Sequence, residues 1–406
     1  MNLRFWGVRG SIASPGHDTA AVGGNTSCVE VVCGETRIVL DAGTGLRALG
    51  QHLLARGAAP VDLTILLSHY HWDHIQGLPF FVPVYMKESS ITIVGGKNGV
   101  MSVEKTLEHQ MSAPVFPVRL DQVGARIGTR EVEPGTVFDV GEATVRVARG
   151  NHPGGVVAYR VEHGGRSVVY ATDTEHFACV DPALRSLCEG ADVLVYDAQY
   201  TPEEYEAKVG WGHSTYSAGA DLARASGVGT FVLFHHDPTR SDARVAEIEA
   251  QARRLFPSSV AAREGLVLEV GGGSSGERAA PGVVTVERSP LLPPAPPSSG
   301  GDPGARVAAS MVDRLSLLVD LASLLTREVD FDALLATTCE RVAGALSAER
   351  ATLWLVDAEQ GDLVSRVAIL PELAALRLPL GRGIAGWVAR TGEPVRIADA
   401  AKDPRF

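Results

Sequence analysis

The stretch Ser68–Gly77, SHYHWDHIQG, contains three of the chain's twelve histidines and an aspartate within six positions. It directly follows VDLTILL, an apolar run that predicts a buried strand. On an extended strand end, His69 and His71 point to the same side, because side chains alternate along a strand. Asp73 and His74 then fall on the following turn, where a helix can begin. This spacing predicts two separate pairs of ligands for two metal ions.

Two ions need more ligands than this stretch supplies, and candidates stand at the ends of later apolar strands or in the turns that follow. They are His152 in RGNHPGG, Asp173 in YATDTEH, and His235 and His236 in VLFHHDP. Ligands that a rigid scaffold gathers at its strand ends are what a metal site requires. Imidazole and carboxylate ligands suit Zn²⁺, with Mn²⁺ and Fe²⁺ as alternatives.

The composition describes a protein with a buried core and no membrane segment. The chain has 406 residues, of which 45% are hydrophobic, which suits two or three domains. The N-terminus lacks the apolar region of a signal peptide, and the five cysteines show no metal-binding or redox spacing, so we expect a cytoplasmic protein. The formal net charge of -11 argues against a general affinity for nucleic acid.

The chain divides at a segment rich in Gly, Ser and Pro. We predict a domain over residues 1–270, a flexible linker over 271–305, and a second part over 306–406. In the first part, apolar strands alternate with periodic helices, which predicts a layered α/β domain. One expected feature is a hairpin with its turn at Gly164 and Gly165, and another is a helix capped by Ser214.

The motifs together resemble the metallo-β-lactamase superfamily: HxHxDH, then a lone His, then an Asp that closes a strand, then a terminal His. FWGVRGS, GGNTSCVEV, GHST at Gly212–Thr215 and FHHDP at Phe234–Pro238 resemble its RNase Z-like and cyclic-nucleotide phosphodiesterase branch. The resemblance covers about residues 1–270. It implies an αββα sandwich with two metal ions, usually zinc, at one edge, and hydrolysis of a phosphodiester bond.

The resemblance also assigns roles to single residues. The family's terminal ligand lies three residues before a proline, so Pro238 selects His235, with His236 as the alternative. Asp73 has a second role, in which one carboxylate oxygen orients the nucleophile. The implied ligands are His69, His71 and His152 for the first metal and Asp73, His74 and His235 for the second, with Asp173 as the bridging carboxylate.

Two residues outside the ligand set carry alternative interpretations. In the resembling branch, the histidine of GHST contacts the phosphate and donates a proton to the leaving group, which makes His213 a catalytic candidate. The alternative is a structural histidine in a loop. Asp41 either holds a ligand histidine through a hydrogen bond or caps a turn.

The expected substrate is a small phosphodiester. The tRNA 3′-end nucleases of the branch carry a long arm between the lone His and the bridging Asp, whereas only 20 residues separate His152 from Asp173 here. The acidic balance points the same way, because binding of a polyanion relies on many Lys and Arg contacts. We therefore predict a cyclic nucleotide or a similar small diester, with no membrane partner and nucleic acid disfavoured. Alternatives are a tRNA 3′-end endoribonuclease-like activity, a thioester or lactone hydrolase, and a non-catalytic metal sensor.

The second part begins with an apolar seam over residues 306–328, formed by Met311, Leu315, Leu318, Ala322 and Leu325. The seam predicts either a short coiled coil that pairs two chains or the first helix of the next domain. The stretch GRGIAGWVARTGEPVRI resembles a GAF domain, a regulatory α/β module that senses ligands or mediates dimerisation. A GAF domain normally continues with further strands past DPRF, so we expect a truncated module here. The combination predicts a hydrolase regulated in signalling, with a possible homodimer through the 306–328 helix or the GAF module.

Overall fold

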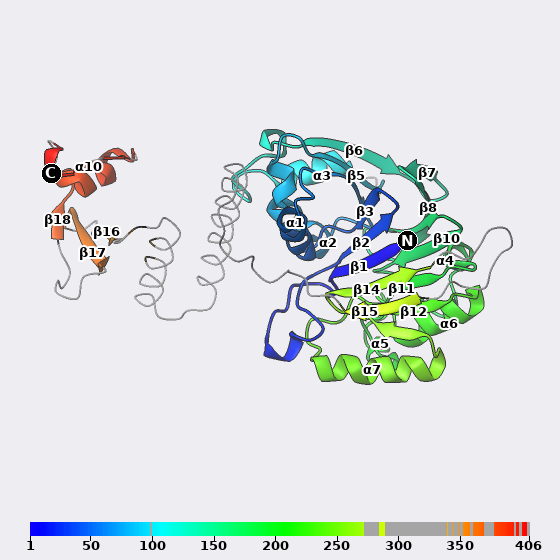
Figure 1. Ribbon diagram of the computed structural model, residues 1–406. Coiled ribbons are helices and arrows are strands. Elements are labelled where there is room, and N and C mark those ends of the chain that lie inside the picture. Colours follow the sequence, from blue (N-terminus) through cyan, green and yellow to red (C-terminus); the bar gives the residue numbers. More distant parts are fainter. Residues whose placement is uncertain are drawn as a thin grey trace. The chain divides into compact units, whose positions relative to one another are not determined.

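The computed structural model describes residues 1–97, 100–271, 284–288, 339, 343, 348, 352–357, 360–368, 377–393, 395–397 and 400–403. The chain divides into two compact units, Met1–Pro296 and Pro297–Phe406. None of the described helices is long and apolar enough to cross a membrane. Figure 1 shows the helices and strands of each unit.

Two sheets form the middle of the first unit. One has eight strands in the order β15-β14-β1-β2-β3-β4-β5-β6, and the other has seven in the order β13-β12-β11-β10-β9-β8-β7. The strands of the first sheet are β1 (Asn2–Gly7), β2 (Cys28–Cys33), β3 (Thr36–Leu40), β4 (Asp62–Leu67), β5 (Ser90–Gly96), β6 (Arg126–Val132), β14 (Leu266–Val270) and β15 (Val284–Arg288). Those of the second are β7 (Val137–Val140), β8 (Ala143–Gly150), β9 (Val156–His163), β10 (Arg166–Ala171), β11 (Val193–Asp197), β12 (Thr230–Phe234) and β13 (Ser259–Ala261).

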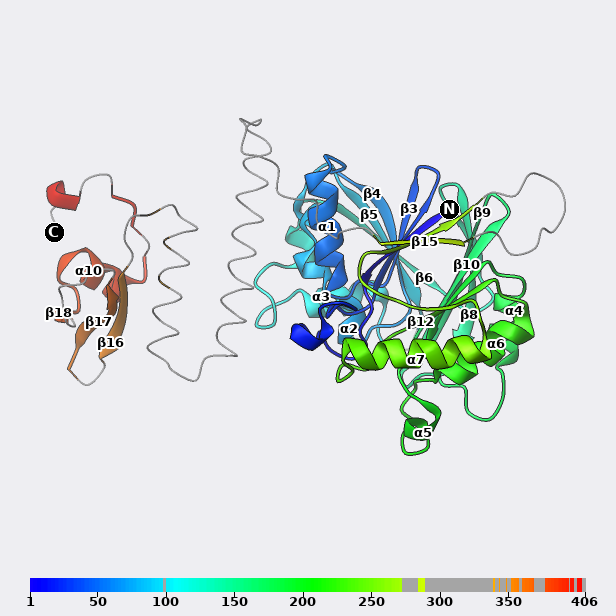
Figure 2. The ribbon, with the colours of Figure 1, turned by 60° about the horizontal axis from the view of Figure 1, so that its bottom comes forward.

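Helices cover the outer face of each sheet (Figures 1 and 2). The first sheet is covered by α1 (Gly45–Ala55) and α3 (Val103–Gln110), and the second by α4 (Pro182–Cys188), α6 (Tyr216–Ser226) and α7 (Asp242–Leu255). Two single-turn helices, α2 (Trp72–Ile75) and α5 (Pro202–Tyr205), follow strand ends. Short 3₁₀ helices span His17–Thr19, Leu78–Phe80, Val82–Tyr85 and Leu120–Gln122.

The core follows from the alternation of side chains along each strand. In β12, Val232 and Phe234 are buried between the two sheets, whereas Phe231 and Leu233 pack against the outer helices. In β4, Leu66 lies between the sheets, and its neighbours in the strand face α1 and α3. Such strands are apolar on both faces because both faces are covered. The result is the αββα sandwich that the resemblance to the metallo-β-lactamase superfamily implies.

Local backbone geometry agrees with the predicted hairpin and corrects the predicted helix cap. Gly164 and Gly165 both have positive φ, 59° and 73°, as a two-residue turn between β9 and β10 requires. Helix α6, however, is capped by Thr215, whose hydroxyl accepts a hydrogen bond from the Ala218 amide. Ser214 is not the cap, because its hydroxyl is engaged by the Tyr196 hydroxyl and the His176 ring.

One segment of the predicted linker is a strand. β15 (Val284–Arg288) pairs antiparallel with β14 and forms the edge of the first sheet. The sequence VTVER contains β-branched residues, which favour a strand, but the Gly-, Ser- and Pro-rich surroundings obscure this preference.

The described part of the second unit is a small antiparallel sheet with one helix. The sheet has the order β16-β17-β18, formed by β16 (Thr352–Asp357), β17 (Asp362–Ala368) and β18 (Arg377–Pro379). A turn at Gly361 joins β16 and β17, with a φ of 69° at that glycine. Helix α10 (Gly383–Thr391) and a 3₁₀ turn over Ala400–Lys402 follow. The predicted 306–328 helix lies outside the described residues, so pairing of two chains through it stays a prediction.

Candidate metal centre

The seven side chains predicted as metal ligands come together at one edge of the sandwich. The strands β4, β8, β10 and β12 each end at this edge, and each is followed by at least one of these residues. Parallel pairing of β10, β11 and β12 brings their carboxyl ends to the same place. The side chains fall into two groups whose candidate ligand atoms lie within 4.8 Å of one another: His69, His71 and His152 in the first, and Asp73, His74, Asp173 and His235 in the second.

The first group consists of three imidazoles. His152 Nε2 lies 3.0 Å from His71 Nδ1, and the His69 ring packs edge-on against both of these rings. His69 Nε2 is buried and has no hydrogen-bond partner among the described residues. Burial lowers the pKa of the His69 imidazole well below its ordinary value, and the nearby His74 lowers it further. Since a buried nitrogen without a partner is costly, this atom fits a metal ligand.

The second group combines two imidazoles with two carboxylates. Asp73 Oδ2 lies 3.1 Å from His74 Nε2 and 3.2 Å from His235 Nε2. The two imidazole nitrogens are themselves 3.3 Å apart. Burial by itself raises the pKa of the Asp73 carboxyl, but the adjacent imidazoles outweigh burial and hold that pKa below its ordinary value. A carboxylate with two converging imidazoles is a donor set that divalent transition metals accept.

Asp173 faces both groups with different oxygen atoms. Its Oδ1 lies 3.3 Å from His74 Nε2 and 3.3 Å from His235 Nε2 in the second group. Its Oδ2 lies 3.8 Å from His69 Nε2 and 4.0 Å from His152 Nε2 in the first. This side chain is therefore placed to bridge two ions, one held by each group.

The backbone around the cluster is held in an uncommon conformation. Five described residues other than glycine have a positive φ: Ser11, Asp41, Asp173, Phe177 and His235. All five belong to the cluster or to the loops that surround it. Such residues occupy a sparsely populated region that the surrounding structure must enforce, and they concentrate at functional sites.

Further hydrogen bonds fix the orientation of the imidazole rings. Asp41 Oδ2 lies 2.7 Å from His74 Nδ1, so Asp41 orients a candidate ligand. This agrees with the prediction that Asp41 holds a ligand histidine through a hydrogen bond. His152 Nδ1 lies 2.8 Å from the Gly212 carbonyl, and His235 Nδ1 lies 2.8 Å from Gln199 Oε1. No sequence motif marks Gln199, because an amide two residues past a strand carries no pattern of its own.

His236, the alternative to His235, lies outside the cluster. Its Nε2 is bound to the Ala262 carbonyl at 2.9 Å, and burial lowers the pKa of its imidazole to about 3.

Gly10 lies close to the cluster, beside His235, since a Cβ atom at this position would stand 2.4 Å from His235 Nδ1. Only glycine therefore fits beside this ring.

His213 stands next to the cluster and is paired with Asp197, an aspartate that no sequence motif marks. His213 Nδ1 donates to Asp197 Oδ2 at 2.8 Å, and the ring stacks on His235 with centroids 5.0 Å apart. Burial by itself lowers the pKa of His213, but the Asp197 carboxylate outweighs it, and the pKa rises to about 9. Within the described part of the chain, no hydrogen bond involves Nε2 of His213. The available signal for Asp197 was that it closes an apolar strand, as Asp173 nearly does.

His213 and Asp197 also belong to a third set of close ligand atoms, together with Asp173 and His235. The geometry alone therefore allows His213 to be either a proton donor beside the metals or a ligand. The two roles predict different metal contents for a variant that lacks this imidazole.

The fold and the site define a hydrolase of the metallo-β-lactamase class, and comparisons with known proteins agree. Residues 36–236 match the family described as beta-lactamase superfamily domain, and residues 330–406 match the GAF domain family. The chain belongs to the metallo-β-lactamase superfamily and carries a GAF domain after the hydrolase domain.

Two relatives and one solved structure illustrate the similarity. The chain is 28% identical over 274 residues to ribonuclease Z of Mycobacterium sp. (strain KMS), covering 61% of this chain and 89% of that protein. It is 25% identical over 301 residues to ribonuclease Z of Methanopyrus kandleri, covering 66% and 97%. The metallo-beta-lactamase fold protein YhfI from Bacillus subtilis superposes with a TM-score of 0.50 at 19% identity, over 66% of this chain and 99% of that one, which supports the fold.

Proposed function

We propose that the first unit is a binuclear, zinc-dependent phosphodiesterase that acts on a small phosphodiester. The observation that carries the proposal is the position of Asp173, which presents one oxygen atom to each of two groups of imidazoles. Zinc is the ion proposed because all seven candidate ligands of the two groups are imidazoles or carboxylates, and five of the seven side chains are buried. Two such ions would supply positive charge against the phosphoryl oxygens and acidify an attacking water.

The chain's own residues account for the remaining steps. Asp73 Oδ2 accepts a hydrogen bond from the Ser11 amide at 2.8 Å, which fixes this carboxylate so that it can orient a nucleophile. The Asp197 carboxylate holds Nδ1 of His213, so the mobile proton of that imidazole is the one on Nε2. We assign His213 as the donor of a proton to the leaving alkoxide.

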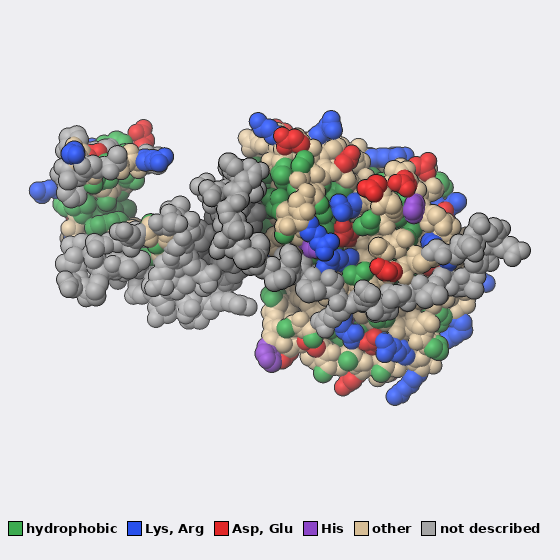
Figure 3. Space-filling model, viewed as in Figure 1, with side chains coloured by type: hydrophobic (Ala, Val, Ile, Leu, Met, Phe, Trp, Pro, Cys, Tyr) green, Lys and Arg blue, Asp and Glu red, His purple; other side chains and the backbone are tan. Residues whose placement is uncertain are grey.

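A small substrate fits the surroundings better than a folded RNA. The 20 residues between His152 and Asp173 form little more than the β9–β10 hairpin. Lys, Arg, Asp and Glu side chains are interspersed over the face of the first unit seen in Figure 3. A cleft beside the first group is lined by His69 together with Lys97 and Arg149, and Arg149 has no ion pair within the described part of the chain. Lys97 is paired with Glu133 at 3.4 Å, so Arg149 is the cation that provides local attraction for an anionic substrate.

A second candidate function is cleavage of RNA near its 3′ end. The observation that favours it is the similarity to the ribonuclease Z proteins of Mycobacterium and Methanopyrus kandleri. The two candidates share the chemistry of the site and differ in the size and charge of the substrate.

The test is a metal analysis of the purified full chain followed by a substrate panel. Cyclic AMP, cyclic GMP, bis-p-nitrophenyl phosphate, a tRNA precursor, a lactone and a thioester would be assayed with the same zinc-loaded protein. We expect close to two zinc ions per chain and a higher kcat/KM on the small diesters than on tRNA. The Asp173→Asn variant should lose at least one ion, whereas His236→Asn, outside the cluster, serves as the histidine control. Protein without transition metal would refute the binuclear site, and faster turnover of tRNA would favour the second candidate.

A further inference from the structure

The exposed aromatic side chains of the described chain gather around the metal centre. Trp72, Trp211 and Phe177 have exposed fractions of 78%, 62% and 53%, and every other aromatic residue among the described ones is buried or half-buried. Each of the three lies on a loop or turn that carries a residue of the site. A large aromatic surface left in water forgoes the free energy of burial, so its concentration at one site indicates a ligand.

Trp72 is placed by the metal motif itself. It lies between His71 and Asp73 and is the first residue of α2, whose next residues are turned into the cluster and buried. The exposed Ile12 follows Ser11, whose amide donates to Asp73 Oδ2. The indole is thus held next to the second group without taking part in it.

Trp211 is fixed by a buried carboxylate. Glu175 accepts hydrogen bonds from the Gly210 amide at 2.7 Å and from the Gly212 amide at 2.9 Å. These two bonds fix the residues on either side of Trp211. The Gly212 carbonyl in turn binds His152, so the turn is tied to the first group. Because the backbone of this turn is already fixed, the Trp211 side chain loses less conformational entropy when it binds a ligand.

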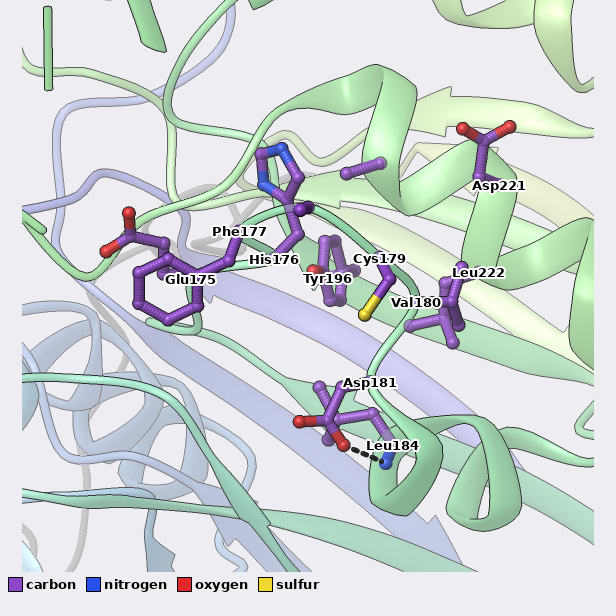
Figure 4. A pocket seen from close by; sticks show the side chains of 12 residues that line it. Glu175, His176, Phe177, Cys179, Val180, Asp181, Leu184, Tyr196, Asp221 and Leu222 are labelled. Atoms are coloured by element: carbon purple, nitrogen blue, oxygen red, sulfur yellow. Dashed lines mark hydrogen bonds between the residues drawn. The ribbon is translucent and has the colours of Figure 1, made fainter. Parts of the chain in front are cut away.

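Phe177 and Lys208 complete the arrangement. Phe177 holds a φ of 48°, which is unfavourable for a bulky side chain. It lines a pocket in which its ring lies beside Glu175 and on the opposite side from Asp221 and Leu222 (Figure 4). The Lys208 ammonium lies 4.4 Å from the centre of the Tyr200 ring and 5.7 Å from that of Trp211, and it pairs with Asp237 at 4.0 Å. The aromatic surface thus carries a positive charge beside it, as surfaces that bind single nucleotides or unpaired strands do.

We propose that Trp72, Trp211 and Phe177 form an aromatic rim that stacks on a nucleobase of the substrate while its phosphodiester occupies the metal centre. The inference rests on the proposed phosphodiesterase function and narrows the substrate to a nucleoside phosphodiester. The three side chains come from three separate loops, and each is more than half exposed. Stacking of one base on an aromatic side chain contributes about 1–3 kcal/mol, or roughly 5- to 150-fold in affinity.

The experiment compares substrates with and without a base on the zinc-loaded full chain. Cyclic AMP is paired with the abasic cyclic ribose phosphate, and a short RNA with an unpaired 3′ tail is paired with the same RNA bearing abasic tail positions. We expect the wild type to prefer the base-bearing member of at least one pair by about 5- to 150-fold in kcat/KM. The pair that shows the preference identifies the source of the base.

The variants then assign the preference to the rim. Trp72→Ala, Trp211→Ala and Phe177→Ala should each move the ratio of the two kcat/KM values toward one, whereas Trp211→Phe should retain most of it. Leu255→Ala, which removes an exposed apolar side chain at the end of α7, is the control and should keep the wild-type ratio. A wild-type ratio in all three alanine variants, or no preference in the wild type, overturns the proposal.

A direct binding measurement separates this proposal from the proposed function. Quenching of tryptophan fluorescence by AMP is compared with quenching by ribose 5-phosphate, in the wild type and in Trp72→Ala and Trp211→Ala. Tighter binding of AMP that weakens at least 5-fold in these variants supports the rim even if no diester is hydrolysed. Equal affinity for the two ligands refutes the rim even if the chain is an active phosphodiesterase.

Discussion

At the scale of single residues, the site depends on carboxylates that each serve more than one neighbour. Asp173 divides its two oxygen atoms between the two groups of imidazoles, and Asp41 binds His74, Ser68 and Tyr170 at once. A buried carboxylate with several donors is fixed in direction, because any rotation breaks more than one bond. The positions of the candidate ligands are thereby defined before any ion binds.

The first prediction concerns the proton donor. Replacing His213 with alanine should lower kcat on a diester with an alkoxide leaving group by about 10²- to 10⁴-fold, the usual contribution of acid–base catalysis. The loss should be much smaller on bis-p-nitrophenyl phosphate, since p-nitrophenolate leaves without a proton. Asp197→Asn should show the same dependence on the leaving group, because its carboxylate holds His213 Nδ1.

Metal content distinguishes this role from the alternative. His213 could instead be a ligand, because it forms a close set with Asp173, Asp197 and His235. In that case His213→Ala will lose metal, and kcat will fall by the same factor on both kinds of diester. Elemental analysis of the variant together with the two kcat values therefore contradicts one role or the other.

The ligand candidates could be predicted from the sequence, whereas their supports could not. Histidines and aspartates at strand ends are visible because the motif HxHxDH is local and the other candidates follow recognisable apolar strands. Asp197, Gln199 and Glu175 act through hydrogen bonds to residues as many as 37 positions away in the chain, and no local pattern encodes such pairs. For the same reason, the aromatic rim could not be predicted from the sequence, because it is defined by the solvent exposure of its side chains in the folded structure.

At the scale of helices and strands, parallel pairing explains why distant segments meet. β3, β4, β5 and β6 are parallel in one sheet, and β10, β11, β12 and β13 are parallel in the other. In sheets of this kind, functional groups collect beyond the carboxyl ends of the strands. Strands such as β4 and β12 were predictable because their apolar runs are bounded by turn residues, whereas β15 lies in the predicted linker. The predicted cap of α6 lies one residue too early. Ser214 and Thr215 are adjacent and chemically similar, so only the contacts of Ser214 decide between them.

The second prediction concerns this cap. Thr215→Ala removes the hydroxyl that accepts from the Ala218 amide and should lower the free energy of unfolding by about 1 kcal/mol, within a range of roughly 0.5–2. Thr215→Ser should restore most of it, because serine offers the same oxygen. Urea denaturation measures both effects, and Ser102→Ala, which removes the equivalent bond to Lys105 at the start of α3, gives a matched cap loss elsewhere. An unchanged midpoint for Thr215→Ala alone would assign the cap to another residue.

At the scale of the whole molecule, two sheets and their helices hold the site rigidly from both sides. Buried residues of both sheets form one continuous apolar layer, so the strand ends that carry the two groups cannot move independently. The first unit folds around a cluster of imidazoles and carboxylates, in which the buried His69 Nε2 has no hydrogen-bond partner among the described residues. Stability of the unit and occupancy of the site should therefore be linked.

The third prediction follows from this linkage. Any ion that binds the folded chain and not the unfolded one stabilises it by RT ln(1 + [L]/Kd), about 2.7 kcal/mol when the ion is at one hundred times its Kd. For a unit of this size, that corresponds to a rise of roughly 5–10 °C in melting temperature. Calorimetry of the full chain before and after chelation should show the fall, and adding back Zn²⁺, Mn²⁺, Fe²⁺ or Mg²⁺ separately should rank the ions. Mg²⁺ is expected to restore least, since it prefers oxygen ligands. In Asp173→Asn, which removes the shared carboxylate, the shift on chelation should shrink; a full-sized shift there would place the stabilising ion elsewhere in the molecule.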